Sequence, residues 1–235
     1  RALETRCLAY GIPLLSGKDS MYVDGHLPGR YGQTHKVSAL ETLQFSVCGV
    51  VADVRRCLTM DAKCAGDRVY VVGLTANELG GSEYYEHLGY VGLNVPVVDP
   101  DRFAARYRLM AEAAAQGLLA SCHGIYRGGL AVHLALVAMG GQLGLTVDLA
   151  KMPSEGVDRD DTLLFSESAG RFIVTVAAEH QEAFERLLAD QPMARVGEVR
   201  AAPQLKVTGT DGATLVDLSI DAMKSAWMGP FGDLT

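Results

Sequence analysis

The 235-residue sequence contains no run of lysine or arginine, and no apolar run approaches the roughly 20 residues that a membrane-spanning helix needs. Its formal net charge is −7, with 21 Lys and Arg residues against 28 Asp and Glu residues. An acidic chain is a poor partner for the phosphates of duplex nucleic acid. The sequence therefore predicts neither a membrane protein nor a nucleic-acid-binding protein, although a local cationic pocket for a small anion remains possible.

Cysteine is also scarce, with five widely spaced residues. None forms a Cys-x-x-Cys pair and none has a histidine at metal-ligand spacing, so no zinc site is expected. Such usage is typical of reduced thiols in a cytoplasmic protein. The first residue is Arg1 rather than Met, and it opens directly into a helical pattern, so we expect a fragment of a longer polypeptide.

Apolar residues make up 49% of the chain and charged residues 21%, as in folded globular proteins. Helices and strands alternate without a strict βαβ rhythm, which predicts an α+β fold. A new unit is expected to begin near Asp61, because the preceding block of about 55 residues is small for an independent domain. Helices are predicted at 2–10, 101–118, 128–141 and 179–190, strands at 12–16, 43–54, 68–72, 121–126, 142–148, 171–177, 194–199, 204–209 and 214–218, and a polar loop at 17–36.

The segment PLLSGKDSMY, residues 13–22, places a Gly-Lys pair after a short apolar run, as phosphate-binding loops do. A nucleotide-binding P-loop is excluded, because Gly11 and Gly17 are separated by five residues and Asp19, rather than Ser or Thr, follows Lys18. Anion binding by the backbone remains one interpretation. The residues also favour an ordinary solvated turn, and spacing alone prefers the turn.

Three further segments combine glycine with charged or hydroxyl side chains. In ELGGSEYY, Glu78 and Glu83 suit a Mg²⁺ ion or a hydroxylated ligand, while Ser82 as the cap of a following helix is the simpler interpretation. In CHGIYRGGL, a helix start beside Arg127 suits a phosphate, and a tight turn with a packed His123 explains it equally well. In LFSESAGRF, the polar residues, among them Ser166, Glu167, Ser168 and Arg171, indicate either a site at a sheet end or a cap.

Together, four segments in this order resemble phosphoribosylformylglycinamidine synthase, the ATP-dependent amidotransferase family of purine biosynthesis. They are GIPLLSGKDSMY, GDRVYVVGLTANELGGSEYY, GLLASCHGIYRGGLAVHLA and LFSESAGRFIVTV. The resemblance covers nearly the whole chain. The wider superfamily includes aminoimidazole ribonucleotide synthetase, which GKDSMY and ELGGSEYY match less well.

The resemblance implies the second of two homologous halves. Residues 1–58 would end an N-terminal domain, and residues 59–235 would form the C-terminal α/β domain of the aminoimidazole ribonucleotide synthetase-like fold. The complete ligase would use ATP and Mg²⁺ to convert formylglycinamide ribonucleotide and glutamine into the amidine. The implied partners are that substrate, the first half of the synthetase across a pseudo-twofold interface, and a glutaminase domain or subunit. The fragment alone is expected to be inactive.

The resemblance also assigns site residues. Gly17 would lie against ATP and Ser20 would contact the ribonucleotide, in an active site of the other half. Lys18 stands where the small form of the enzyme has a Mg²⁺-binding Asn, so no metal role is predicted for it. The GKDS version matches the large form.

The remaining segments would belong to an auxiliary nucleotide site whose family motif reads His-Asp-x-Ser-Asp-Gly-Gly. Here Gly124 replaces a metal-binding Asp, Tyr126 a nucleotide-contacting Ser, and Arg127 a second Asp. We therefore predict a degenerate site without metal or cofactor, formed by His123, Gly124, Tyr126, Arg127, Glu167 and Ser168. The alternative function is a non-catalytic scaffold or nucleotide-binding module derived from the same superfamily.

Overall fold

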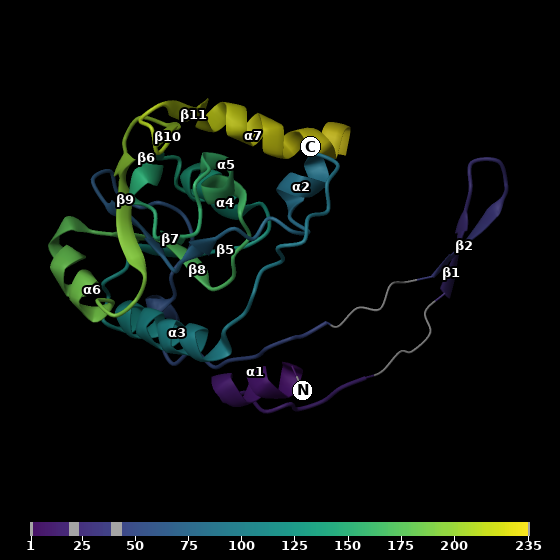
Figure 1. Ribbon diagram of the computed structural model, residues 1–235, viewed down its shortest axis with the longest axis horizontal. Helices are drawn as coiled ribbons and strands as arrows, with labels where there is room; N and C mark the ends of the chain where they lie inside the picture. Colours follow the sequence, from purple (N-terminus) through teal and green to yellow (C-terminus); the bar gives the residue numbers. More distant parts are fainter. Residues whose placement is uncertain (1, 19–23, 39–43, 235) are drawn as a thin grey trace. The chain divides into compact units, whose positions relative to one another are not determined.

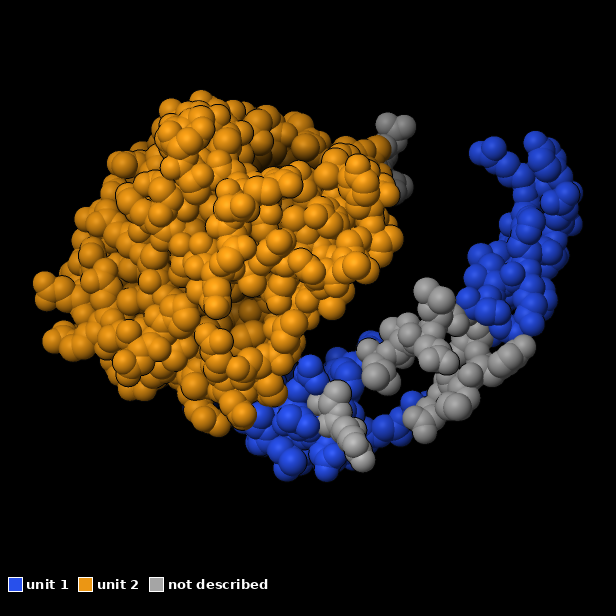
Figure 2. Space-filling model, in the orientation of Figure 1, with its two compact units in different colours: residues 1–52 blue, residues 53–235 orange. Residues whose placement is uncertain are grey.

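The computed structural model describes residues 2–18, 24–38 and 44–234 (Figure 1). The chain divides into two compact units, residues 1–52 and residues 53–235 (Figure 2). The division lies close to the predicted boundary at residue 58. The assignment of residues 1–58 to the end of another domain stays a prediction. Within the described ranges, no helix is both long enough and apolar enough to cross a membrane.

The first unit contains helix α1 (Ala2–Tyr10) and a hairpin of β1 (Asp24–Pro28) and β2 (Thr34–Ser38). α1 ends as predicted, because Gly11 adopts a φ of 65°, which favours glycine, and its N–H donates to the Leu8 carbonyl. The hairpin corrects the predicted loop at 17–36. Its strands had escaped prediction because their pattern is polar on both faces.

Two predicted strands of this unit, 12–16 and 43–54, are wrong. Residues 12–16 and 44–53 have no regular secondary structure, and Val54 begins the short 3-10 turn η1 (Val54–Arg56). Their apolar side chains are exposed, with Leu15 89% and Val50 100% exposed rather than buried. An apolar run becomes a buried strand only beside other strands, and the described residues of this unit place none next to these segments.

Residues 53–235 are built around a seven-stranded mixed sheet with the order β11-β10-β6-β9-β3-β8-β5 (Figure 1). Only the β6–β10 pair is parallel, and a separate parallel pair joins β4 to β7. This mixed sheet with helices confirms the predicted α+β class. The strands are β3 (Arg68–Val72), β4 (Thr75–Ala76), β5 (Ser121–Ile125), β6 (Gly144–Asp148), β7 (Ser154–Glu155), β8 (Arg171–Val176), β9 (Met193–Arg200), β10 (Gln204–Thr208) and β11 (Thr214–Ser219).

Helices cover both faces of this sheet. Leu130, Leu134 and Val137 of α4 pack with Met223 of α7 against one face, while α3 and α6 contribute to a second core on the other. The helices are α2 (Glu83–His87), α3 (Pro100–Ala115), α4 (Gly129–Gly141), α5 (Asp160–Phe165), α6 (Gln181–Leu187) and α7 (Ile220–Met228), with short 3-10 turns η2 (Leu149–Lys151), η3 (Ala178–His180) and η4 (Gly229–Leu234). The predicted strands and helices from residue 68 onward are confirmed within a few residues; α5 and α7 were not predicted.

The face opposite α4 has two unlike halves. On β3 and β8, buried Tyr70, Val72 and Val174 pack under Phe184 of α6 and Met110 of α3. On β9, β6, β10 and β11 the same face carries polar residues. Strand register places Arg68, Glu198, Thr146, Lys206 and Asp217 side by side on five consecutive strands.

A β-bulge on β9 produces this arrangement. Arg195 lies opposite Tyr70, and Glu198 lies opposite Arg68. Arg195 and Glu198 are three residues apart on β9, whereas Tyr70 and Arg68 are only two residues apart on β3. The extra residue lies at Val196–Gly197, where a Cβ on Gly197 would come within 1.9 Å of the Thr146 carbonyl oxygen. The bulge therefore keeps Arg195 and Glu198 on one face of the sheet.

Candidate functional site

The candidate site lies where β5 ends and α4 begins. Gly128 and Gly129 adopt φ values of 87° and 68°, which residues with a side chain rarely adopt. A Cβ on Gly129 would lie 2.7 Å from the backbone of Phe165, so the start of α4 approaches the end of α5 closely. The predicted tight turn and helix start are both present here, and the two glycines make the approach possible.

Two histidines, the buried His133 and the half-buried His123, form a hydrogen-bonded pair beside this turn. The Tyr126 N–H donates to His133 Nε2 at 2.9 Å, and His133 Nδ1 lies 2.8 Å from His123 Nε2. Because Nε2 of His133 accepts, its Nδ1 carries the proton and donates to His123. Burial, reinforced by the neighbouring His123, lowers the pKa of His133 to about 4, and burial also lowers the pKa of His123. Both rings are therefore neutral at pH 7.

Glu167 is hydrogen-bonded to two backbone amides of this region. Its Oε1 accepts from the Gly128 N–H at 2.8 Å and from the Glu83 N–H at 2.9 Å. The carboxylate thus joins the β5–α4 turn to the first residue of α2. Ser82 caps α2, as predicted, by accepting from the Tyr85 N–H at 3.2 Å. The N–H groups of Gly128 and Glu83 are therefore satisfied by a side chain of the chain itself.

Arg127 forms an ion pair with Glu83 across the mouth of the turn. Both side chains are largely exposed, 77% for Arg127 and 43% for Glu83. α2 is held in position for this contact by Tyr84, whose ring stacks on Phe165 of α5 with centroids 4.4 Å apart. The positive charge of Arg127 is thus balanced by a carboxylate from another element.

Tyr126 lies over Gly124. A Cβ on Gly124 would come within 2.2 Å of the Tyr126 hydroxyl oxygen, so the ring occupies the space next to residue 124. A carboxylate at position 124 would collide with this ring unless the ring moved. The residues His123, Tyr126, Arg127 and His133, with Glu83 and Glu167, are called the turn cluster below.

Ser168 lies apart from the turn cluster in its contacts. Its hydroxyl accepts from the Ala76 N–H at 3.0 Å, beside Ser166, whose hydroxyl donates to the Ala76 carbonyl at 2.7 Å. Arg171 supports the same loop by donating to the Ser168 carbonyl at 2.8 Å and to Thr75 Oγ1 at 2.9 Å. Burial lowers the pKa of Arg171 to about 10, so it stays cationic at pH 7. This network fixes β4, and it explains the polar residues of LFSESAGRF as structural contacts.

The donor set of the turn cluster does not suit Mg²⁺, which prefers several carboxylate and water oxygens. Glu83 is paired with Arg127, and Glu78 accepts from the Val97 N–H at 2.8 Å. Among the described residues, no group of three or more His, Cys, Asp or Glu side chains is placed to hold a metal ion. Glu78 and Glu83, the candidate pair from the sequence, therefore have other contacts.

The predicted loop residues lie in the other unit. Gly17 and Lys18 are exposed in a segment without regular secondary structure, and Ser20 lies outside the described residues. His133 was missed by the sequence analysis, although a histidine within the otherwise apolar start of α4 was a visible signal. Glu83 was considered for a metal rather than as the partner of Arg127, because spacing does not reveal contacts between distant segments.

Comparison with known proteins gives one family and a set of similar folds. The family described as "AIR synthase related protein, C-terminal domain" matches residues 65–210. PurL of T. maritima complexed with FGAR is similar over 93% of this chain and 36% of that chain, with 16% identity and a TM-score of 0.70. The structure of PurLQS from Thermotoga maritima matches 72% of this chain and 28% of that chain, with 18% identity and a TM-score of 0.61.

PurL of T. maritima complexed with ATP gives a further match over 72% of this chain and 27% of that chain, with 19% identity and a TM-score of 0.58. The chain thus spans about a third, or less, of the length of these structures. At these identities the similarity concerns the fold.

Proposed function

This chain belongs to the AIR synthase related proteins, whose C-terminal domain it carries in residues 65–210, and from that premise we propose that it is part of an ATP-dependent amidotransferase. The complete ligase would convert formylglycinamide ribonucleotide, ATP and glutamine into formylglycinamidine ribonucleotide in the cytoplasm. ATP would activate the amide oxygen, and ammonia from a glutaminase domain or subunit would displace the phosphate.

One observation carries this proposal. The similarity to PurL complexed with FGAR covers 93% of the chain, whereas residues 53–235 make up less than four fifths of it. The match therefore extends beyond the family domain into residues 1–52, where the segment GIPLLSGKDSMY lies. Agreement of fold on both sides of the boundary at Asp53 supports the interpretation of the two units as parts of one PurL-like half.

In this proposal the loop at Gly17 serves an active site formed mainly by the first half of the synthetase. Gly17 would approach ATP, Lys18 would add a positive charge, and Ser20 would contact the ribonucleotide. Because the ATP site and the ammonia source lie elsewhere, the 235 residues alone should not turn over. An ATPase assay dependent on formylglycinamide ribonucleotide tests this, and turnover by the isolated chain would refute it.

A second experiment tests the loop in the complete enzyme. Ser20→Ala should raise the KM for formylglycinamide ribonucleotide about tenfold, as expected for one lost hydrogen bond to a charged ligand. Ser38→Ala, in the exposed β1–β2 hairpin, removes a hydroxyl of the same kind and is the matched control. An unchanged KM in the Ser20→Ala enzyme would remove the loop from the active site.

We also propose that the turn cluster is a degenerate auxiliary site that binds neither Mg²⁺ nor ADP. This is supported by the absence of a carboxylate at Gly124, by the ring of Tyr126 beside it and by the Arg127–Glu83 ion pair. Equilibrium dialysis of the full-length protein with ADP and Mg²⁺ tests the proposal, with Gly124→Asp/Tyr126→Ser/Arg127→Asp as the comparison. Mg²⁺-dependent ADP bound beside Gly124 and Tyr126 in the parental sequence would contradict it.

A non-catalytic scaffold is the second candidate, favoured by the way the turn cluster satisfies its own charges. It predicts that Ser20→Ala leaves KM unchanged while the fold and assembly persist. The two candidates are therefore separated by the same kinetic measurement.

A further inference from the structure

The polar half of the sheet face opposite α4 carries a cluster of three arginines around one glutamate. Glu198 Oε2 lies 2.9 Å from Arg68 Nη1 and 3.4 Å from Arg195 Nη2, and its Oε1 lies 3.1 Å from Arg200 Nη1. Arg68 comes from β3, while the others come from β9. These four residues are called the arginine cluster below.

The arginine cluster has more positive than negative charge. Three guanidinium groups share one carboxylate, so the cluster carries a formal net charge of about +2. The neighbouring pair of Lys151 and Asp148, 3.1 Å apart, adds no further net charge. This local surplus contrasts with a chain whose formal net charge is −7.

A groove lies over the strands beside these arginines. It has a volume of about 450 Å³ on β6, β9 and β10 and is lined in part by Thr146, Thr208, Arg195, Glu198 and Arg200. Since one water molecule occupies about 30 Å³, there is room for a phosphate group with its hydration shell. The groove lies on the sheet face opposite α4, whereas the turn cluster is at the start of α4.

The guanidinium groups are also held in place. Arg200 Nε donates to Thr146 Oγ1 at 3.3 Å, and Arg68 Nη1 donates to the Gly66 carbonyl at 3.2 Å as well as to Glu198. Glu198 acts as the common acceptor that orients all three side chains. Arginine side chains fixed in this way lose less conformational freedom when they bind an anion.

We propose that this groove is a binding site for a small doubly charged oxyanion of the phosphate class. The anion would contact Arg195 and Arg200 in the groove, while Glu198 keeps its ion pairs with the arginines. Two negative charges would neutralise the surplus, so a dianion should bind better than a monoanion of similar size. Planar forks of N–H donors match phosphate oxygens in geometry as well as in charge.

A small anion fits the groove better than an acidic protein segment. The cationic side chains converge on one carboxylate, whereas a peptide would meet the exposed Asp217 on β11 next to Lys206. The arrangement therefore favours a compact ligand whose charge is concentrated at one point.

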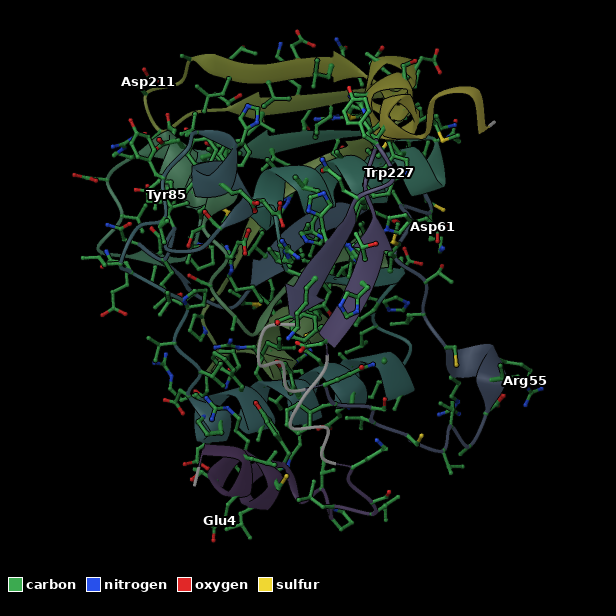
Figure 3. The ribbon with its side chains drawn as sticks, turned by 90° about the vertical axis from the view of Figure 1, so that its right-hand side faces the viewer. Glu4, Arg55, Asp61, Tyr85, Asp211 and Trp227 are labelled. Atoms are coloured by element: carbon green, nitrogen blue, oxygen red, sulfur yellow. The ribbon has the colours of Figure 1, made fainter. Side chains whose placement is uncertain are left out.

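Isothermal titration of the 235-residue chain with inorganic phosphate at pH 8, at constant ionic strength set with NaCl, tests the proposal. Saturable binding at a single site is expected, with sulfate competing and nitrate not competing. Arg195→Gln and Arg200→Gln should each weaken phosphate binding about tenfold, and the double variant should abolish it. Arg55→Gln is the matched control, because Arg55 is 86% exposed on η1 and lies far from the β10–β11 turn at Asp211 in Figure 3.

Three results would overturn the proposal. The first is the absence of saturable phosphate binding to the parental chain. In the second case, Arg55→Gln weakens binding as much as Arg195→Gln, which indicates nonspecific screening. The third is binding of a poly-glutamate peptide with no competition by phosphate, which would assign the surface to an acidic protein partner.

Discussion

The turn cluster and the arginine cluster lie in the same folded unit and use the same side-chain chemistry to opposite effect. At the turn, Arg127 pairs with Glu83, and Glu167 accepts from the N–H groups of Gly128 and Glu83. On the sheet, three arginines meet one glutamate beside an open groove. The turn cluster has a formal net charge of −1, from Glu83 and Glu167 against Arg127, whereas the arginine cluster keeps a positive surplus.

The difference teaches that a segment can resemble a binding motif without having groups available to bind a ligand. The β5–α4 turn stands where the resemblance to the amidotransferase family places a nucleotide, yet its groups bind one another. The arginine cluster is part of no motif that the sequence analysis singled out. Charge that is left over after internal pairing is the better indicator of where an anion would bind.

The largest expected effect is the pH dependence of the free energy of unfolding that His133 of the turn cluster causes. The pKa of His133 is lowered to about 4 by burial, from about 6.5 in an unfolded chain. Because the pKa of His133 is lower in the folded chain, the stability that its neutral form contributes is fully present above pH 6.5. This contribution is lost as the pH falls toward 4. At 1.36 kcal/mol per pKa unit, the loss is about 3 kcal/mol.

Urea unfolding of the isolated chain at pH 7.5 and pH 4 measures this loss. His133→Gln keeps an acceptor for the Tyr126 N–H but does not titrate, so its loss of stability over the same range should be smaller by about 3 kcal/mol. Equal losses in both proteins would show that His133 takes up no proton on unfolding, because it is already protonated in the folded chain at pH 4. The turn would then be more open to water than its contacts indicate.

The next largest effect concerns Glu167. Glu167→Ala leaves the N–H groups of Gly128 and Glu83 without their carboxylate acceptor, and it should lower the free energy of unfolding by about 2 kcal/mol. Glu167→Gln retains an acceptor oxygen and should recover about half of the loss. Glu155→Ala, on the exposed strand β7, is the control. A change no larger than that of the control would mean that water replaces Glu167 without cost.

Glu198→Gln tests the arginine cluster from within. Removing the shared carboxylate leaves three cations together, so we expect a loss of about 1 kcal/mol at low salt. The loss should shrink when NaCl is raised from 50 mM to 500 mM, because salt screens the repulsion. Thermal unfolding at the two salt concentrations measures it, and a loss independent of salt would mean that packing rather than charge holds Glu198.

The smallest effect is expected at Arg127. Its ion pair with Glu83 is largely exposed, so Arg127→Ala should change the free energy of unfolding by less than about 1 kcal/mol. Chemical denaturation of the two proteins in parallel measures this difference. A larger loss would show that Arg127 holds α2 in place, which would make the turn cluster more rigid than proposed.

Much of the fold of residues 53–235 was predictable from the sequence. β3 has the predicted bounds because Arg68–Val72 is a β-branched and aromatic run that lies in the middle of the sheet and is buried on both faces. α7 was missed although Ser219 caps it and Ile220, Met223 and Trp227 follow at helical spacing. Trp227 is labelled on this helix in Figure 3. The signal was present there and was not used.

The errors lie where partners outside the segment decide the structure. Residues 12–16 and 43–54 read as strands by composition, but an apolar run specifies a strand only together with its neighbours. For the site, the resemblance to the amidotransferase family gave His123, Gly124, Arg127 and Glu167 as candidates. It could not show that Glu83 pairs with Arg127, because that contact joins residues far apart in the chain. The charge alternation of Arg195-Val-Gly-Glu-Val-Arg200 was a visible signal for the arginine cluster.

The bulge at Val196–Gly197 makes the arginine cluster sensitive to chain length rather than to composition. Deleting Gly197 would restore simple alternation along β9, so either Arg195 or the pair of Glu198 and Arg200 would point into the core beside Leu145 and Val207. A substitution at Arg195 or Arg200 leaves the bulge unchanged, whereas deletion of one residue turns side chains from the groove face to the core face.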